Sequence, residues 1–136
     1  MSTYQGNTII NQAVEAVAGL INALGLFSSI YRGPLGTADG LCFEVGPTRP
    51  EAVYMDKNKY IPIDFTINGK HENLLTITEA LNTIHQSLTM RRSYPSGATW
   101  EIVDITTATE PQIIGREDSN QHIMASSLLV KVATKI

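Results

Sequence analysis

The sequence predicts an α+β fold: a two-layer sandwich in which a mixed or antiparallel β-sheet carries two main helices packed on one face. Two long segments repeat apolar residues at steps of three and four, and the segments between and after them alternate or form short apolar runs. The expected order is helix, three strands, helix, three strands, and helices on one sheet face bury their apolar sides most economically. A chain of 136 residues suits a single domain, 1–136.

The first helix is expected from about Thr8 to Phe27, because apolar residues recur there on one face. The opposite face is nearly uncharged, since Glu15 is the only charged residue between Met1 and Tyr31. Polar residues interrupt any apolar run of about 18 residues, which argues against a transmembrane span. The residues of the apolar face are Ile10, Val14, Val17, Ile21 and Leu24.

A helix that is nearly apolar all round is normally covered on more than one side. In a small domain a neighbouring subunit can supply the second cover, although alanine and glycine also make a plain neutral surface. Both interpretations fit this composition. The residues that we expect at a subunit interface are Ile9, Ala13, Ala16, Ala18 and Leu20.

Between the two helices the sequence predicts a loop and three strands. Glycine and proline mark Ser28–Gly40 as the loop, and Leu41–Val45 follows as a short strand. Ala52–Met55 and Tyr60–Ile67 are expected to form a hairpin. Pro62 lacks an N–H to donate, so it should lie at a strand start or on a sheet edge.

The second helix is expected from Glu72 to Met90, after a turn at Asn68-Gly69. The strands before and after it make a β-α-β crossover candidate. Its predicted core positions are Leu74, Ile77, Leu81, Ile84 and Leu88.

Three more strands are expected after this helix. They are Trp100–Thr106, a short strand at Pro111–Arg116, and a final strand within Ile123–Ile136. In the final strand, one face should carry Leu128, Val130 and Val132.

Composition argues against several classes of function. A net charge of −3, with a pI near 5.5, does not favour specific nucleic-acid binding, which needs clustered Lys and Arg.

Cys42 is the only cysteine, which excludes an internal disulfide and a cysteine zinc cluster. Its position in an apolar strand favours a buried structural thiol. The first residues lack the basic segment of a secretory signal, so we expect the chain in the cytoplasm after synthesis, and without a membrane partner.

Few residues suggest chemistry. His71 and Glu72 are adjacent at a predicted corner, where neighbouring side chains point apart, so a solvated His71 explains them better than a catalytic dyad. His85 is expected on the flank of the second helix, and the histidines share no metal-ligand spacing. Arg91-Arg92 suits a helix C-terminus, although a phosphate or partner contact remains open. We therefore predict no catalytic, cofactor or metal site, and a binding or assembly module instead of an enzyme.

The order of the elements and the residue patterns within them resemble those of the minor capsid and tail-terminator proteins of long-tailed bacteriophages and prophages. The resemblance rests on the first helix, the alternating "YIPIDFTING", the helix "ENLLTITEALNTIHQSL", the strand "WEIVDI", "IIGRED" and the terminal aliphatic strand. It spans most of the chain and includes no motif that assigns a role to a single residue.

This resemblance implies a structural role in virion assembly. Such proteins form a ring, typically of six subunits, that caps the tail tube and presents the surface that joins the head. The implied partners are other copies of the chain, the tail tube and head-connector proteins. The implied location is the head-tail junction of the virion, with assembly in the host cytoplasm. The alternatives are an unrelated homo-oligomeric or small-ligand-binding α+β domain and, last, an enzyme that brings Asp64, His71 or His122 together by folding.

Overall fold

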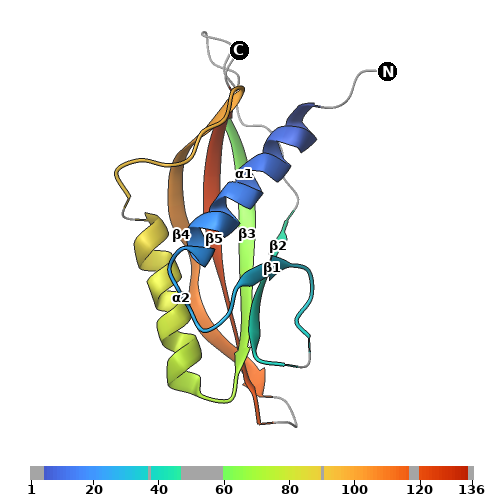
Figure 1. The fold of residues 1–136 in the computed structure, drawn as a ribbon, viewed down its shortest axis with the longest axis vertical. Coiled ribbons are helices and arrows are strands. Elements are labelled where there is room, and N and C mark those ends of the chain that lie inside the picture. The colour runs from blue at the N-terminus through green and yellow to red at the C-terminus, as the bar shows by residue number, and fades with distance from the viewer. Residues whose placement is uncertain (1–4, 37, 47–59, 90, 117–119, 135–136) are drawn as a thin grey trace.

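The computed structural model describes residues 5–36, 38–46, 60–89, 91–116 and 120–134. Within these residues the chain forms two helices and five strands, which Figure 1 labels. In chain order they are α1 (Gln5–Asn22), β1 (Ile30–Arg32), β2 (Gly40–Val45), β3 (Tyr60–His71), α2 (Leu74–Thr89), β4 (Trp100–Arg116) and β5 (His122–Thr134).

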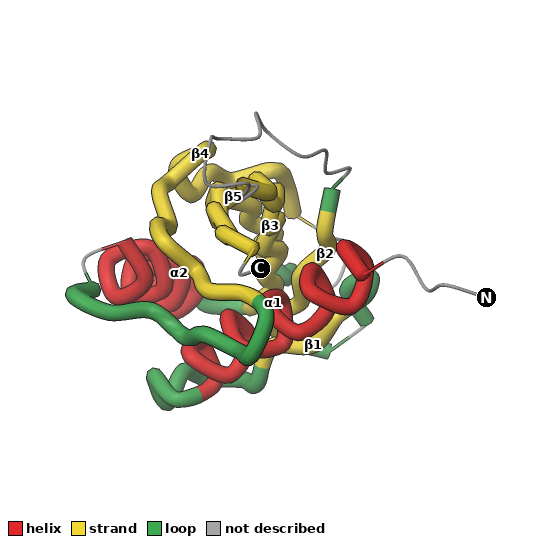
Figure 2. The backbone as a smooth tube through the Cα atoms, turned by 90° about the horizontal axis from the view of Figure 1, so that it is seen from above, coloured by secondary structure: helices red, strands yellow, loops and turns green. Residues whose placement is uncertain are grey.

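The strands form one mixed sheet in the order β1-β2-β3-β5-β4. β1 and β2 are parallel, and the other neighbouring pairs are antiparallel. Both helices lie on the same side of the sheet (Figure 2). The predicted α+β fold class is therefore confirmed. The predicted crossover is also present, because α2 joins β3 to β4, which run in the same direction with β5 between them.

The core lies between the sheet and the two helices. Alternate residues of β3 and β5 face it, as their sequence pattern predicts, and Leu128, Val130 and Val132 are all buried there. Four of the five predicted core residues of α2 are buried, and Leu74 is half-buried. In α1, Ile10 and Leu24 pack against the core without being fully buried, while Val14, Val17 and Ile21 are buried.

α1 ends at Asn22, five residues before the predicted end. Gly25 has a φ of 69°, a left-handed conformation that glycine adopts readily and that commonly ends a helix. The Asn22 side chain then accepts a 2.8 Å hydrogen bond from the backbone N–H of Ile30, the first residue of β1. This bond ties the end of the helix to a short strand inside the segment predicted as a loop.

The predicted turn at Asn68-Gly69 is wrong, because β3 continues through both residues to His71. Gly69 has a packing role here. A Cβ on Gly69 would lie 2.8 Å from a methyl carbon of Ile77 and 3.0 Å from one of Leu41. The glycine lets α2 approach the sheet closely. The chain turns after His71, where the Asn73 side chain caps α2 by accepting the Leu75 N–H at 2.9 Å.

β4 is one strand of 17 residues where the sequence predicts two short ones. It pairs with the 13 residues of β5 through four register shifts. Each shift places an extra residue in β4, as in a β-bulge, which bends the strand and increases its twist. Pro111 lies within the shift between Thr109 and Gln112, where a missing N–H is tolerated. Pro62 lies near the start of β3, as predicted. The predicted strand Ala52–Met55 is outside the described residues.

Candidate functional site

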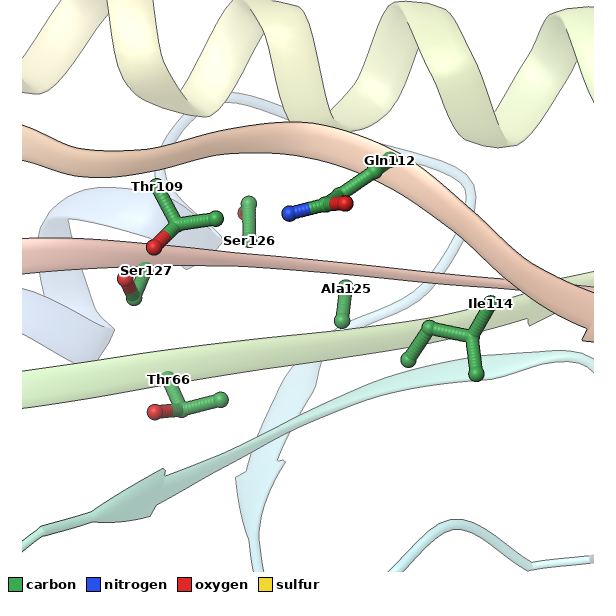
Figure 3. A pocket seen from close by; sticks show the side chains of 7 residues that line it. All are labelled: Thr66, Thr109, Gln112, Ile114, Ala125, Ser126 and Ser127. Carbon is green, nitrogen blue, oxygen red and sulfur yellow. The ribbon is translucent and has the colours of Figure 1, made fainter.

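A hollow of about 380 Å³ opens on the sheet (Figure 3). Thr66 faces away from the helices, because it alternates with Phe65 and Ile67, which are buried in the core. Ser127 lies opposite Thr66 on the neighbouring strand, and Thr109 of β4 lies opposite Ser127. The hollow therefore lies on the side of the sheet without helices, here called the free face. Its lining residues are Thr66, Thr109, Gln112, Ile114, Ala125, Ser126 and Ser127.

Five of the seven lining residues carry hydroxyl or amide groups, which can donate or accept hydrogen bonds, and carbon atoms make up most of the exposed lining. Ser126 is 2% exposed and lies opposite the buried Ile67, so its hydroxyl faces the core side of the sheet and is not offered by the free face. Two exposed carboxylates belong to the same face, because Glu44 pairs with Thr66 across the strands and Asp64 lies two residues before Thr66. The free face thus offers acceptors for a polar or cationic group. It is wide open on the sheet surface, unlike the enclosed pockets that bury most of a small molecule.

Three of the five large apolar side chains that are exposed among the described residues belong to segments at one end of the molecule. Ile113 and Ile114, near the end of β4, are 57% and 63% exposed, and Leu75, in the first turn of α2, is 64% exposed. β4 ends and α2 begins at the same end, drawn lowest in Figure 1. Exposed apolar groups that lie together often mark a contact with another protein.

The predicted pair of His71 and Glu72 is not a catalytic dyad. His71 is tied to other groups: its Nδ1 accepts the Asn73 N–H at 2.9 Å, and its Nε2 lies 3.6 Å from the Asp39 carboxylate. The ring also meets Phe27 edge-on. Hence His71 is not the freely solvated side chain that the sequence suggested. Asp39 also accepts a 2.7 Å hydrogen bond from Gln121, so the cluster fastens a loop to the sheet end.

Two further candidates lie in the interior. His85, expected on the flank of α2, is 5% exposed, which corrects that prediction. Its Nδ1 lies 2.9 Å from the Thr107 hydroxyl, and burial lowers its pKa, partly opposed by the Glu110 carboxylate. Cys42 is buried as predicted, and burial raises the pKa of its thiol, to which Glu44 adds. A raised pKa disfavours the reactive thiolate.

The structure places the expected interface residues of α1 in two environments. Ile9 and Ala13 are buried in the core of their own subunit. Ala16, Ala18 and Leu20 are half-buried and pack against that core. These three retain some accessible surface, and their contact with a neighbour remains a prediction.

Among the described residues, no group of three or more His, Cys, Asp or Glu side chains could hold a metal ion. Within the same residues, no helix is long and apolar enough to cross a membrane. Sequence reasoning missed the hollow. Its signal is the run of small polar residues in "TTATE" and "ASS", which is unusual in strands because neither segment alternates with large apolar residues.

The fold is similar to that of a chain in the virion of a native gene transfer agent particle. The two structures align with a TM-score of 0.61 over 96% of this chain and 99% of that chain, at 14% sequence identity. At this identity the likeness shows a shared fold. No protein-family model matches the sequence. No curated protein matches it either.

Proposed function

We propose that this protein is a structural component of a virion, specifically a tail terminator that caps the tail tube as a ring and forms the head-tail joining surface. The observation that carries the proposal is the fold shared, over nearly the whole length of both chains, with a virion chain. The sequence resemblance to tail terminators supports the same role from a separate direction.

The surface of the subunit suits this role. A ring of identical subunits needs two different surfaces on each copy, which meet head to tail and close. The chain offers a polar free face on one side of its sheet, a helix layer on the other, and an apolar end with Leu75, Ile113 and Ile114. We assign the apolar end to contacts within the assembled particle, either between subunits or with the tail tube.

The geometry favours assembly over catalysis. Both ring nitrogens of His71 face groups of the protein itself, and the Cys42 thiol is buried with a raised pKa. The hollow on the free face is wide open to solvent, whereas a small-molecule site buries most of its ligand. A small-ligand site is therefore less well supported than a protein contact.

The test is to measure the mass of the purified protein by light scattering over a concentration series and to image the same sample by negative stain. We expect rings of about six subunits with a central hole. In a second experiment, assembled tail tubes are added, and we expect the protein to bind to their ends. A protein that stays monomeric and never binds tube ends would contradict the proposal.

A further inference from the structure

We propose that the free face of one subunit receives the Arg91-Arg92 loop of the next copy, and that this contact joins neighbours in the ring. The inference rests on the ring of the proposed function and names the two surfaces that meet. It follows from charge complementarity between the carboxylates of the free face and the arginine pair on the helix side of the same chain.

The receiving surface is built from acceptors suited to a guanidinium. Hydroxyls of Thr66, Thr109 and Ser127 line the hollow from three adjacent strands (Figure 3). Glu44 and Asp64 add exposed carboxylates beside Thr66. Arginine carries five N–H donors in a planar fork, so it can bond a carboxylate and several hydroxyls at once.

The arriving group is the pair of arginines that follows α2. Arg91 and Arg92 are both exposed, and Arg91 donates at 3.1 Å to the Ser93 carbonyl of its own loop. The other described arginines are engaged by side-chain amides: Arg32 donates to Asn11 and Arg116 to Asn120. Arg91 uses one of its five N–H donors in its own loop, and Arg92 makes no side-chain bond among the described residues, so the pair keeps donors for a partner.

The two surfaces lie on opposite sides of the subunit. The loop continues from α2 on the helix side of the sheet, while the hollow opens on the free face (Figure 2). A subunit cannot satisfy its own pair, but a head-to-tail neighbour can, and such contacts close into rings. Exposed ion pairs contribute modestly to affinity, so these charges should mainly select partner and register. Ile114, in the lining of the hollow, supplies apolar contact area.

The test uses reciprocal charge reversal. One variant carries Arg91→Glu and Arg92→Glu, and a second carries Glu44→Arg and Asp64→Arg. Each alone places like charges across every interface, so each should need at least about tenfold higher concentration than the wild type to form rings. An equimolar mixture should recover rings, because the reversed loop then meets the reversed face and the native loop meets the native face. The control, Glu79→Arg, reverses a charge on an exposed position of α2, away from both proposed surfaces, and should assemble normally.

Ring mass is read by light scattering, and far-UV circular dichroism checks that each variant is folded. If one reversal unfolds the chain, the milder Arg91→Gln with Arg92→Gln, or Glu44→Gln with Asp64→Asn, replaces it, with the expectation of weakened assembly. Variants that assemble like the wild type, or a mixture that fails to recover rings, would overturn the pairing while leaving the terminator role intact. A wild type that forms no ring would instead overturn the proposed function itself.

Discussion

The two halves of β4 belong to one strand and have opposite surroundings. In the first half, Trp100, Ile102 and Ile105 are buried against the helices. The Trp100 indole also donates a 2.7 Å hydrogen bond to Gln12 of α1. In the second half, from Thr109 to Arg116, no residue is buried, and Ile113 and Ile114 are more than half exposed.

This difference separates two uses of the same element. The first half stabilises the subunit, because its apolar side chains are removed from water. The second half keeps its pairing with β5 but leaves apolar groups in water, which contributes little to the stability of a single subunit. The bulges and Pro111 also make the edge a poor template for pairing with another strand. We therefore expect partners to meet its side chains, with its backbone edge left unpaired.

The largest expected effect comes from Ile105→Asp. Ile105 is fully buried, so the change removes about 1.5–3 kcal/mol of apolar burial and adds an unpaired buried carboxylate at a cost of several kcal/mol. Together these approach the whole stability of a typical domain, so the chain should be unfolded at 25 °C. Circular dichroism and urea titration would measure this. A cooperative transition near that of the wild type would show that Ile105 is not in the core.

Trp100→Ala should destabilise the folded chain by about 3–5 kcal/mol, because it removes a large buried ring and its bond to Gln12. The control is Gln12→Ala, which removes the bond but keeps the ring and should cost about 1 kcal/mol. Equal losses for the two variants in urea titrations would mean that the hydrogen bond, and not ring burial, holds α1 against β4.

A smaller effect is expected from acid, acting through His85 at the boundary between the two halves. Burial lowers the pKa of His85, so below its ordinary value near 6.5 the unfolded chain binds the proton more readily than the folded chain. Stability should be complete above about pH 6.5 and should decrease as the pH falls below it. Urea midpoints at pH 7.5 and 5.0, compared with those of His85→Gln, isolate this contribution from His71 and His122. An unchanged difference between the two pH values in the variant would exclude His85 as the cause.

The smallest effect on stability is expected from Ile113→Asp, the same substitution as Ile105→Asp, made in the exposed half. The free energy of unfolding should change by less than about 0.5 kcal/mol, because the side chain already lies mostly in water. Ring assembly or binding to tail tubes should nevertheless weaken. Normal assembly, measured by light scattering and imaging of tube ends, would remove Ile113 from the contact surface.

The fold could be predicted wherever apolar residues repeat with one clear period, either that of a strand or that of a helix. The alternation in β3 and the helical spacing in α2 each identified a face that is indeed buried. β4 was divided in two because the register shifts between Thr107 and Gln112 break the alternation: Ala108, Thr109 and Glu110 are consecutive and all exposed. His85 was misplaced because the buried side of α2 is wider than a stripe at steps of three and four.

The candidate site was harder to predict, because it depends on long-range pairing. Thr66, Thr109 and Ser127 line one hollow only after three strands align, and the runs of small polar residues in the sequence do not indicate which strands align. The Asn68-Gly69 signal failed for a similar reason. Gly69 is needed because α2 packs closely against it. This contact comes from another part of the fold, so the residues next to Gly69 in the sequence do not predict it.

The most direct measurement of the contrast within β4 is amide hydrogen exchange of the wild type, followed from dilute to concentrated protein. We expect peptides that cover Thr109–Arg116 to gain protection as the protein assembles, because a partner packed on these side chains should suppress opening of the β4–β5 pairing. The first half of β4 should keep the protection it already has in the single subunit. Protection that is independent of concentration in both halves would contradict the assignment of the exposed half to assembly.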